Sequence, residues 1–432
     1  MNRPTHGFRG FALVTRITNR IVFCAGAVTV IAGHAGNALS QCTSYDIEVI
    51  EAQSCSLGIP LSIGFSINEQ GRICGYYDNC AGVEYYQAFA WFGTFPYAAI
   101  TMPLPFLEGR AYAINDKDEI VGLMDANPLP VHAFFLQKGV VSMLALLPGK
   151  IDAEAFSINN QSQIVGYCGG AGLTATLWQD GKAIDLEIPV GPSTVARDIN
   201  ESGQIVGWMG VAPGPPFPGE AFLWDGGKTT PLGFPNGATN SEAWSINNHG
   251  DICGAYIYPN PNQKGSLTRA ILWSKGQMID LGTVGGHPRS GAFDISDAGE
   301  IVGECWGNPA VPEKGFIWRD GVMTALDDLL PPGTSVISIP FATAINNVGQ
   351  ITGYCQILEK NGLSQHASAF VMTPIPPIPG DFNCNKIVDV DDLLAVINRW
   401  NYQGAPGIPA DFNSDGIVGS ADLMIVIDNW TK

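Results

Sequence analysis

Charged residues are scarce in this sequence, and basic residues are the scarcest. Asp, Glu, Lys and Arg make up only 14% of the 432 residues, and 40 acidic side chains outnumber 22 basic ones, giving a formal net charge of −18. A field of this sign disfavours nucleic acid and anionic membrane surfaces as partners and suits cations such as calcium. Long runs of Ala, Glu, Lys and Leu are also missing, whereas Gly (52) and Pro (30) are plentiful. This balance favours an all-β fold with many turns.

Motifs of known catalytic chemistry are missing too. The sequence contains neither G-x-S-x-G nor H-E-x-x-H, and its six His fall at unrelated positions. Carboxylate pairs such as Asp327 and Asp328 are expected on loops or strand ends, where a solvated surface explains them. We therefore assign no catalytic residue and expect a protein that binds rather than one that catalyses.

The N-terminus has the pattern of an export signal. Four Arg precede the apolar run IVFCAGAVTVIAG, and small residues follow at Gly36 and Ala38. This pattern predicts a signal peptide over residues 1–38, with an uncleaved anchor as the alternative, and hence a secreted protein located outside the cell or on its surface. The apolar run is short for a membrane span, so none is expected after signal removal. Export permits disulfides, with Cys42–Cys55 and Cys74–Cys80 as local candidates. Cys168, Cys253, Cys305 and Cys355 recur at matching repeat positions and are expected as buried thiols, with disulfides as the alternative.

A phrase of about fourteen residues recurs seven times. Consecutive copies lie 41 to 50 residues apart. Each has a small residue three positions before a shared Ile, a polar residue (Asn in six copies) directly after it, and Gly eight positions after it. A period of this length indicates an array or a propeller. The shared positions are Ile67, Ile114, Ile158, Ile199, Ile246, Ile295 and Ile345.

The local chemistry assigns strands to each copy. Asn-x-x-Gly between two apolar runs is typical of a β-hairpin, because Asn folds onto its own backbone and Gly accepts a positive φ. The Gly eight positions after the Ile falls inside a strand, where Gly marks a bulge or a close backbone approach. A second hairpin follows, as in ATLWQDGKAIDL, so each copy holds four short strands. We predict an all-β domain over residues 39–373, a seven-bladed β-propeller of four-stranded antiparallel blades, with a linear solenoid as the structural alternative.

The seventh copy lacks its fourth strand. It stops after AFVMTP, which would leave an unpaired sheet edge. The segment SYDIEVIEA has the alternation of a strand, and we expect its residues 45–50 to complete the last blade. Such a pairing would join the two ends of the domain and close the ring.

One resemblance covers about residues 45–373. His132-Ala133-Phe134, its relatives at other blades, and the phrase I-N-x-x-G-x-I-V-G resemble the extracellular HAF-repeat family. The resemblance implies a repeat fold outside the cell. It implies no reaction, because that family is defined by its repeat.

The composition changes after the Pro-rich stretch TPIPPIPG, which predicts a linker over residues 374–380. Two segments, DFNCNKIVDVDDLLAVINRW and DFNSDGIVGSADLMIVIDNW, then align without a gap, thirty residues apart. Each places oxygen-bearing side chains, and one backbone carbonyl, in a loop before an apolar helix. Calcium takes six to eight hard oxygen ligands, which this spacing wraps around one point. The predicted ligands are Asp381, Asn383, Asn385, Ile387, Asp389 and Asp392 in the first loop and Asp411, Asn413, Asp415, Ile417 and Asp422 in the second.

This tandem, residues 381–432, resembles the type I dockerin duplicate, because Asp closes each loop and each repeat has one loop–helix unit. The resemblance implies a small all-α domain with two calcium sites and a cohesin-like domain or cell-surface scaffold as partner. Lys386 stands where the second loop has Gly416, so we expect the first site to bind calcium more weakly. Polar helix caps without metal are the alternative. We expect Trp400 and Trp430 in the core, and the resemblance implies partner contacts at Val390, Asp391, Ser420 and Ala421.

The predicted propeller face with long loops is rich in aromatic residues. Rings beside Pro/Gly loops on a rigid scaffold suggest ligand stacking, including stacking on sugar rings, and packing of the propeller's own rim is the alternative. The candidates are Tyr76, Tyr77, Trp208, Tyr256, Tyr258 and Trp306. We therefore predict a secreted binding or scaffold propeller that docks through its calcium-dependent tail, with polysaccharide as a candidate ligand. One alternative is a dockerin-bearing glycoside hydrolase or lyase of polysaccharide catabolism, and another is a structural surface protein.

Overall fold

The computed structural model describes most of the chain from residue 44 onward. The described residues are 44–50, 61–78, 86–93, 98–100, 102, 108–125, 130–189, 191, 193–210, 219–259, 266–358, 365–375, 378–381, 387–403, 410–413 and 417–431. The predicted signal peptide and the predicted ligands Asn383, Asn385 and Asp415 lie outside these ranges.

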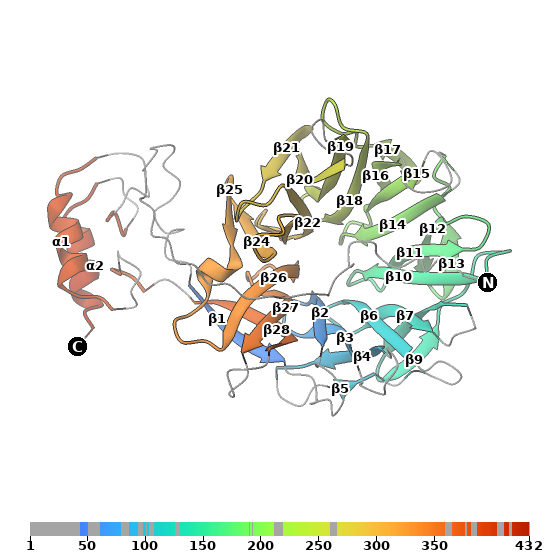
Figure 1. Ribbon diagram of the computed structural model, residues 1–432, viewed down its shortest axis with the longest axis horizontal. Helices are drawn as coiled ribbons and strands as arrows, with labels where there is room; N and C mark the ends of the chain where they lie inside the picture. Colours follow the sequence, from blue (N-terminus) through green and yellow to red (C-terminus); the bar gives the residue numbers. More distant parts are fainter. Residues whose placement is uncertain are drawn as a thin grey trace.

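Seven four-stranded antiparallel sheets surround a common axis, and a small helical region follows them (Figure 1). The prediction of a seven-bladed β-propeller with an all-α tail is confirmed. Six blades are built from consecutive strands: β2(Ser62–Ile67), β3(Ile73–Asp78), β4(Tyr86–Trp91), β5(Ala98–Ala99); β6(Glu108–Ile114), β7(Ile120–Asp125), β8(His132–Gln137), β9(Val140–Met143); β10(Asp152–Ile158), β11(Ile164–Gly169), β12(Thr174–Gln179), β13(Lys182–Asp185); β14(Ser193–Ile199), β15(Ile205–Gly210), β16(Gly219–Asp225), β17(Lys228–Pro231); β18(Asn240–Ile246), β19(Ile252–Pro259), β20(Ser266–Ser274), β21(Gln277–Gly282); and β22(Arg289–Ile295), β23(Ile301–Trp306), β24(Lys314–Arg319), β25(Val322–Ala325).

The seventh blade combines both ends of the domain. Its order is β1-β28-β27-β26, where β1 is Ser44–Ile50, β26 Val336–Ile345, β27 Ile351–Leu358 and β28 Gln365–Ile375. The register places Tyr45 opposite Pro374 and Ile50 opposite Ala369, as expected for the closing segment. β28 continues through Pro374 and Ile375, so two residues assigned to the linker by composition belong to this strand. A short 3₁₀ helix, η2(Leu326–Leu329), precedes β26.

The first strand of each blade lies nearest the axis, since first strands of neighbouring blades contact one another all the way round. Each first strand carries a β-bulge at the residue two positions before the shared Ile, as between Ala111 and Ala113. The repeated Gly of the second strand lies against this bulge. A β-carbon on Gly122 would sit 1.9 Å from the carbonyl oxygen of Arg110, which explains why no side chain is tolerated there. The bulge and close approach predicted from the strand Gly are thus confirmed.

Two expectations about buried side chains need correction. Cys74 is a fully buried free thiol, so it forms no disulfide with Cys80. Trp400 and Trp430 are 44% and 41% exposed, because the tail's core is made by smaller residues. That core contains Val388, Val396, Ala410, Val418 and Val426.

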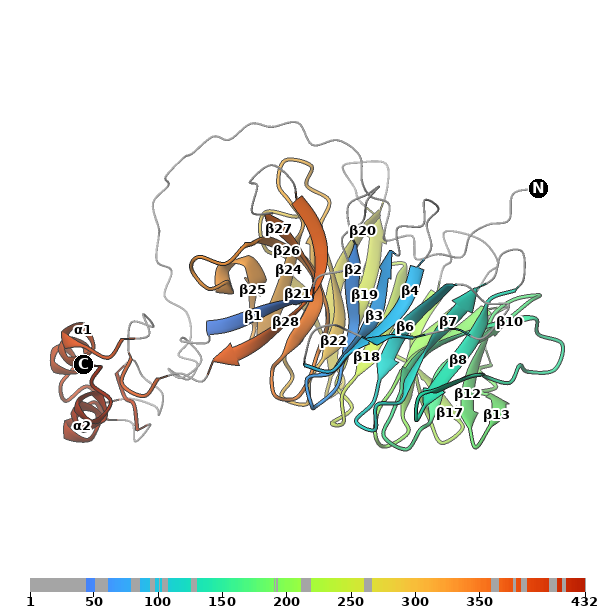
Figure 2. The same cartoon turned by 90° about the horizontal axis from the view of Figure 1, so that it is seen from below.

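The tail consists of α1(Val390–Asn398) and α2(Ser420–Asp428), and Figure 2 shows it as a separate unit at the C-terminal end. Its two halves bind each other reciprocally. The amide of Asn401 in the first half donates to the carbonyl of Val418 in the second (2.9 Å). The equivalent residues, thirty positions away in each case, form the reverse bond: the amide of Thr431 donates to the carbonyl of Val388 (2.9 Å). The sequence duplication therefore produces a pseudo-symmetric pair of loop–helix units.

Candidate functional site

Four loop carboxyl groups of the tail are buried. Asp381 and Asp411, the first residues of the loops, are 6% and 2% exposed, and Asp392 and Asp422, the last residues, are fully buried. Burying ionised groups is costly unless partners or a cation compensate. The sequence therefore places four carboxylates where a cation would offset that cost.

Hydrogen bonds fold the second loop onto its closing residue. Asp422 Oδ2 accepts from the amide of Gly419 (2.8 Å), and Asp422 Oδ1 accepts from the amide of Asn413 (3.2 Å). The first loop closes similarly, since Asp392 Oδ2 accepts from the amide of Asp389 (2.9 Å). Ion binding would draw on the remaining oxygen lone pairs of these carboxylates. Carboxylate, amide and carbonyl oxygens are the ligands that calcium prefers, so the residues present fit calcium.

Within the described ranges, no group of three or more His, Cys, Asp or Glu side chains converges in metal-binding geometry. Among the described ligands, the structure brings together Asn413 and Asp422, at positions three and twelve of the second loop. The predicted ligands at positions three and five of the first loop and five of the second are outside those ranges. Calcium at each loop therefore stays a prediction, supported by the burial of the loop ends.

Apolar side chains point outward along both tail helices. The exposed residues are Ile387, Val390, Leu394, Ile397 and Trp400 along the first unit and Ile417, Met424, Ile427 and Trp430 along the second, all between 41% and 54% exposed. Four pairs lie at equivalent positions thirty residues apart. We call these nine residues the tail stripe. The predicted partner-contact residues Val390, Asp391, Ser420 and Ala421 are all exposed in the first turns of the helices, at one end of the stripe.

Sequence reasoning missed most of the tail stripe. The signal was present, because these positions are apolar in both copies while a different helical face supplies the core residues Val396 and Val426. A helix that is apolar on two faces buries one face in its own domain and offers the other to a partner.

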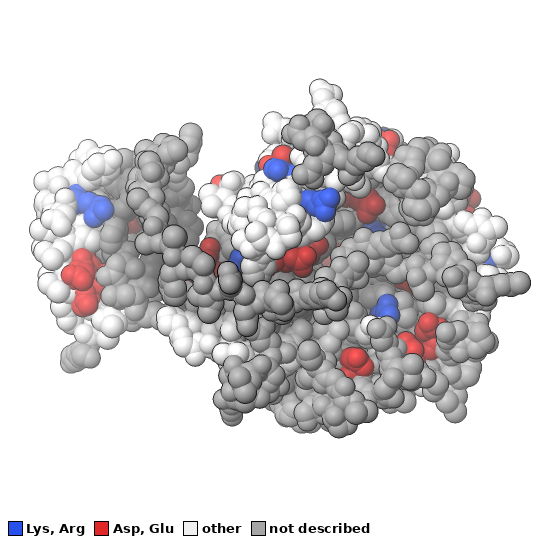
Figure 3. Space-filling view, in the orientation of Figure 1, with Lys and Arg blue, Asp and Glu red and all other residues white. Residues whose placement is uncertain are grey.

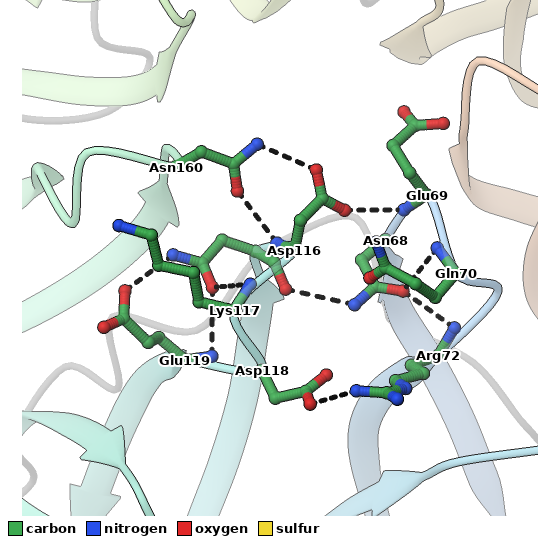
Figure 4. Close-up of polar contacts among 10 residues, drawn as sticks. Asn68, Glu69, Gln70, Arg72, Asp116, Lys117, Asp118, Glu119 and Asn160 are labelled. Atoms are coloured by element: carbon green, nitrogen blue, oxygen red, sulfur yellow. Dashed lines mark hydrogen bonds and ion pairs between the residues drawn. The ribbon is translucent and has the colours of Figure 1, made fainter.

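Near the propeller axis, the inner turns are linked from blade to blade through Asn side chains (Figure 4). Each Asn donates from Nδ2 to the carbonyl of the equivalent residue in the next blade: Asn68 to Asn115, Asn115 to Asn159, Asn159 to Asn200, Asn200 to Asn247, Asn247 to Ser296, and Asn346 to Asn68, at 2.9–3.1 Å. Ser296 is too short to repeat the link. The Asn therefore closes its own turn and also joins neighbouring blades. The sequence pattern predicts only the first of these two roles.

The next residue of each turn forms a second ring. Its side chain accepts from the amide of the equivalent residue in the preceding blade, as Asp116 Oδ1 does from Glu69 (2.9 Å). The ring runs through Glu69, Asp116, Asn160, Glu201, Asn248, Asp297 and Asn347 and closes on Glu69. Burial raises the pKa of Glu69, and Asp116 and Asp297 add to that rise while the Asn347 amide opposes it.

A chain of side chains also crosses the inner strands of blades three to seven. Asp198 accepts from the hydroxyls of Ser157 (2.6 Å) and Ser245 (2.9 Å) and from the amide of Ile246 (2.8 Å). Asp294 lies 2.7 Å from the same Ser245 hydroxyl and accepts from the amide of Ile345 (2.8 Å). Burial, together with nearby Asp198, raises the pKa of Asp294 to about 6.

The seven bulge residues form a ring of their own, which we call the bulge ring. Its members are Phe65, Tyr112, Phe156, Arg197, Trp244, Phe293 and Thr343. Ring centroids of consecutive members lie 5.4 Å apart for Phe65 and Tyr112 and 5.1 Å apart for Trp244 and Phe293. All seven remain partly exposed, whereas the residue before each of them is buried. No sequence expectation covered this set.

Charged side chains from neighbouring strands adjoin the bulge ring. The guanidinium carbon of Arg197 lies 4.7 Å from the centroid of Phe156, and Trp244 donates from Nε1 to Glu242 Oε2 (3.1 Å). Burial raises the pKa of Glu154, although the Tyr167 hydroxyl, which donates to it at 2.8 Å, opposes the shift. The arrangement combines aromatic faces with guanidinium and carboxyl groups.

The predicted ligand-face aromatics are engaged mainly with the propeller itself. Tyr76 stacks on Phe65 at 5.4 Å, Tyr77 donates to Gln87 (2.9 Å), and Tyr256 donates to Asp280 (3.0 Å). Trp208 is 8% exposed in a cluster with Tyr167 and Val195, Tyr258 stacks on Tyr256, and Trp306 is partly exposed. Ligand stacking by these six residues stays a prediction.

In the face shown in Figure 3, Lys and Arg occur as separate groups rather than as a patch, and acidic groups lie on both the tail and the propeller. Among the described residues, no helix is both long and apolar enough to cross a bilayer. The described part of this face therefore offers no continuous basic surface.

Fold and tail together define a β-propeller protein with a dockerin tail. Residues 379–429 match the family described as the dockerin type I domain. Domains of this family bind calcium and dock on cohesin domains, and they occur in extracellular proteins. This chain therefore carries a dockerin type I domain behind a seven-bladed propeller.

Other comparisons add only remote likenesses. No curated protein matches the sequence. A puromycin-hydrolyzing peptidase of Mycobacterium tuberculosis has 9% identity and a TM-score of 0.46, over 72% of this chain and 52% of that chain. YCF48 bound to D1 peptide has 11% identity and a TM-score of 0.43, over 78% and 96%. An acylaminoacyl peptidase of Pyrococcus horikoshii has 11% identity and a TM-score of 0.40, over 73% and 60%. Likenesses this distant carry no argument about function.

Proposed function

We propose that this is a secreted binding propeller of the HAF-repeat type that docks, through calcium-loaded loops, onto a cohesin domain of a larger extracellular assembly. The tail stripe is the observation that carries the proposal. It repeats at equivalent positions of the two loop–helix units, whose loops have buried carboxyl groups at their ends. Calcium would hold the loops and so fix the helices that present the stripe.

Polysaccharide is the ligand class we propose for the propeller. The supporting observation is the supply of aromatic rings beside hydrogen-bonding side chains near its axis, as at Trp244 and Glu242. Aromatic faces with a few placed polar groups are typical of small-molecule sites. Docking would then bring bound polysaccharide to the assembly.

A polysaccharide hydrolase or lyase is the second candidate, and Glu304 favours it. Its strand neighbours in register are Gly291 and Gly315. Burial, reinforced by Glu313, raises the pKa of Glu304 to about 8. A carboxyl group that keeps its proton at neutral pH can serve as a general acid. Loss of glycan turnover in Glu304→Gln, with glycan binding retained, would support this function.

Docking can be tested with a panel of immobilised type I cohesin domains, with calcium and with chelator. We expect capture of the full chain only with calcium, and loss of capture in Asp422→Ala. Ile397→Asp combined with Ile427→Asp should abolish capture while leaving calcium binding, measured by calorimetry, intact. The control is Val140→Asp, at a residue 67% exposed on the propeller, which should be captured like the wild type. Calcium-independent capture, or capture unaffected by the stripe variants, would contradict the proposal.

A further inference from the structure

The same backbone irregularity occurs at one level of the axis in all seven blades. Each first strand bulges at the residue two positions before its shared Ile, so two residues there oppose one residue of the second strand. Bulges bend a strand and redirect a side chain, and they are enriched beside functional sites. Seven equivalent bulges therefore redirect seven side chains at one level of the propeller.

Contacts between blades show that these side chains encircle the axis. Tyr112 contacts Phe65 of the preceding blade (5.4 Å) and Phe156 of the following one (5.7 Å), and Arg197 then lies over Phe156. Thr343 donates from Oγ1 to the carbonyl of Gly64, linking the last blade to the first (2.6 Å). Only residues at the inner edge of the blades can contact equivalents on both sides, so the bulge ring lines the axis.

The side chains of the bulge ring are partly exposed, so they do not fill the axis completely. The small residue before each bulge residue is fully buried, as Ala111, Ala155 and Ala243 are at 0% exposure. The bulge residues themselves keep part of their surface exposed although they lie within strands on the innermost side of the blades. Solvent, or a ligand in its place, therefore reaches these aromatic faces.

We propose that the bulge ring is the binding site of the propeller and takes a neutral oligosaccharide. This rests on the polysaccharide ligand proposed above and assigns its site to the bulge ring instead of the loop-face aromatics expected from the sequence. Aromatic faces at Phe156 and Trp244 supply apolar surface for the C–H faces of sugar rings. Neighbouring carboxylate and guanidinium groups supply acceptors and donors for hydroxyl groups, since the strand backbones are already paired in the sheets.

The charges select the ligand class. Two guanidinium groups, of Arg110 and Arg197, lie near the carboxyl group of Glu154. Further carboxyl groups belong to Glu242, Asp198 and Asp294 on the inner strands. Arg110 is itself held over the ring of Tyr86, at 4.5 Å. Carboxyl groups outnumber guanidinium groups here, so a polyanion is disfavoured, whereas the many hydroxyl groups of a neutral sugar can use both acceptors and donors.

The test is a glycan array of neutral and uronic-acid oligosaccharides, followed by calorimetry with the best binder, using the full chain and two variants. We expect Trp244→Ala to weaken binding of a neutral oligosaccharide at least about tenfold, and Tyr258→Ala, the matched rim variant, to leave it within about twofold. Circular dichroism and the melting temperature verify folding of each variant. Because Trp244→Ala removes a large side chain, Arg197→Gln provides a second, smaller change with the same expected direction.

Three results would overturn the proposal. Binding that is lost in Tyr258→Ala but kept in Trp244→Ala would leave polysaccharide recognition intact and place it on the loop face. Selective binding of uronic-acid oligosaccharides would contradict the neutral class. An absence of any glycan binding would remove both the site and the ligand, while the cohesin capture experiment, run on the same preparation, would report separately on docking.

Discussion

The hydroxyl of Ser245 lies 2.7 Å from Oδ1 of Asp294 and 2.9 Å from Oδ2 of Asp198. A hydroxyl group has one proton, so it can donate to only one of these carboxylates. Asp198 also accepts from the Ser157 hydroxyl and from the amide of Ile246. The remaining contact is satisfied when Asp294 is protonated and donates to Ser245.

This arrangement makes the stability of the propeller depend on pH. The pKa of Asp294 is about 6 in the folded protein and near 3.9 when unfolded. Between these values the folded state holds the extra proton, so stability falls as pH rises from about 4 to about 6 and stays lower above. The loss of unfolding free energy from this group is about 3 kcal/mol. In Asp294→Asn we expect a flatter dependence of the urea midpoint over pH 4–7.5.

Asp198→Asn is the matched control for that prediction. It removes charge from the carboxylate that receives several donors, so it should destabilise the fold at every pH in the range rather than flatten the profile. Identical pH profiles for Asp294→Asn and the wild type would show that the folded protein does not retain the proton.

The ring of Asn side chains that links neighbouring blades, which we call the Asn ring, is interrupted at Ser296. Completing it should stabilise the propeller. Six Asn side chains cross to the next blade, and Ser296, 3% exposed, does not. Ser296→Asn should add the seventh link, to the carbonyl of Asn346, and raise the unfolding free energy by about 1 kcal/mol in urea denaturation. The converse change, Asn247→Ser, should cost about 1–3 kcal/mol because it leaves a buried carbonyl without its donor. Equal midpoints for Ser296→Asn and the wild type would argue against the link.

A disulfide can test the closing strand. Asp46 of β1 lies directly opposite Thr373 of β28, and both are exposed. Asp46→Cys with Thr373→Cys should form a bridge that raises the melting temperature under oxidising conditions, by an amount equivalent to about 4 kcal/mol, because it closes a very long loop. Dithiothreitol should reverse the gain. Glu48→Cys with Thr373→Cys pairs diagonal positions and should cross-link poorly.

The first loop of the tail, which we expect to bind calcium more weakly than the second, can be tested by one substitution. Lys386 replaces the Gly found at the equivalent position of the second loop, and its charge would lie near the ion. Lys386→Gly should tighten the weaker of two calorimetric binding events about fivefold. Asp392→Ala should remove that event and leave the stronger one. A single binding event in the wild type, unaffected by Lys386→Gly, would contradict two unequal sites.

Much of this architecture can be predicted from the sequence because its signals are local and repeated. The turn after each shared Ile needs a positive φ at its fourth residue, and Gly, or Asp118 and Ser162 in two copies, supplies it at 60° or more. The unmatched third strand of the last copy likewise indicated where β1 must pair. The turn depends only on residues close in sequence, and the pairing of β1 depends only on the unpaired edge that β28 would otherwise leave.

The bulge ring and the Asn ring could not be predicted in the same way. The bulge residues differ from Phe to Arg to Thr, and which of them faces the axis depends on the register of two strands. The Asn links depend on the spacing between blades, which no single repeat encodes. In the tail, Trp400 and Trp430 looked like core residues because aromatic rings usually are, but Val396 and Val426 already fill the space between the helices.

The way the tail leaves the propeller matters once the protein is tethered. Tension through an anchored tail enters at Ile375, the end of β28, which is bonded to β27 on one side and to β1 on the other. Without β1, the loaded strand would lie at the edge of its sheet and could be peeled away along one ladder. With β1 in place, two ladders must rupture together, so the segment that closes the ring also reinforces its mechanical attachment.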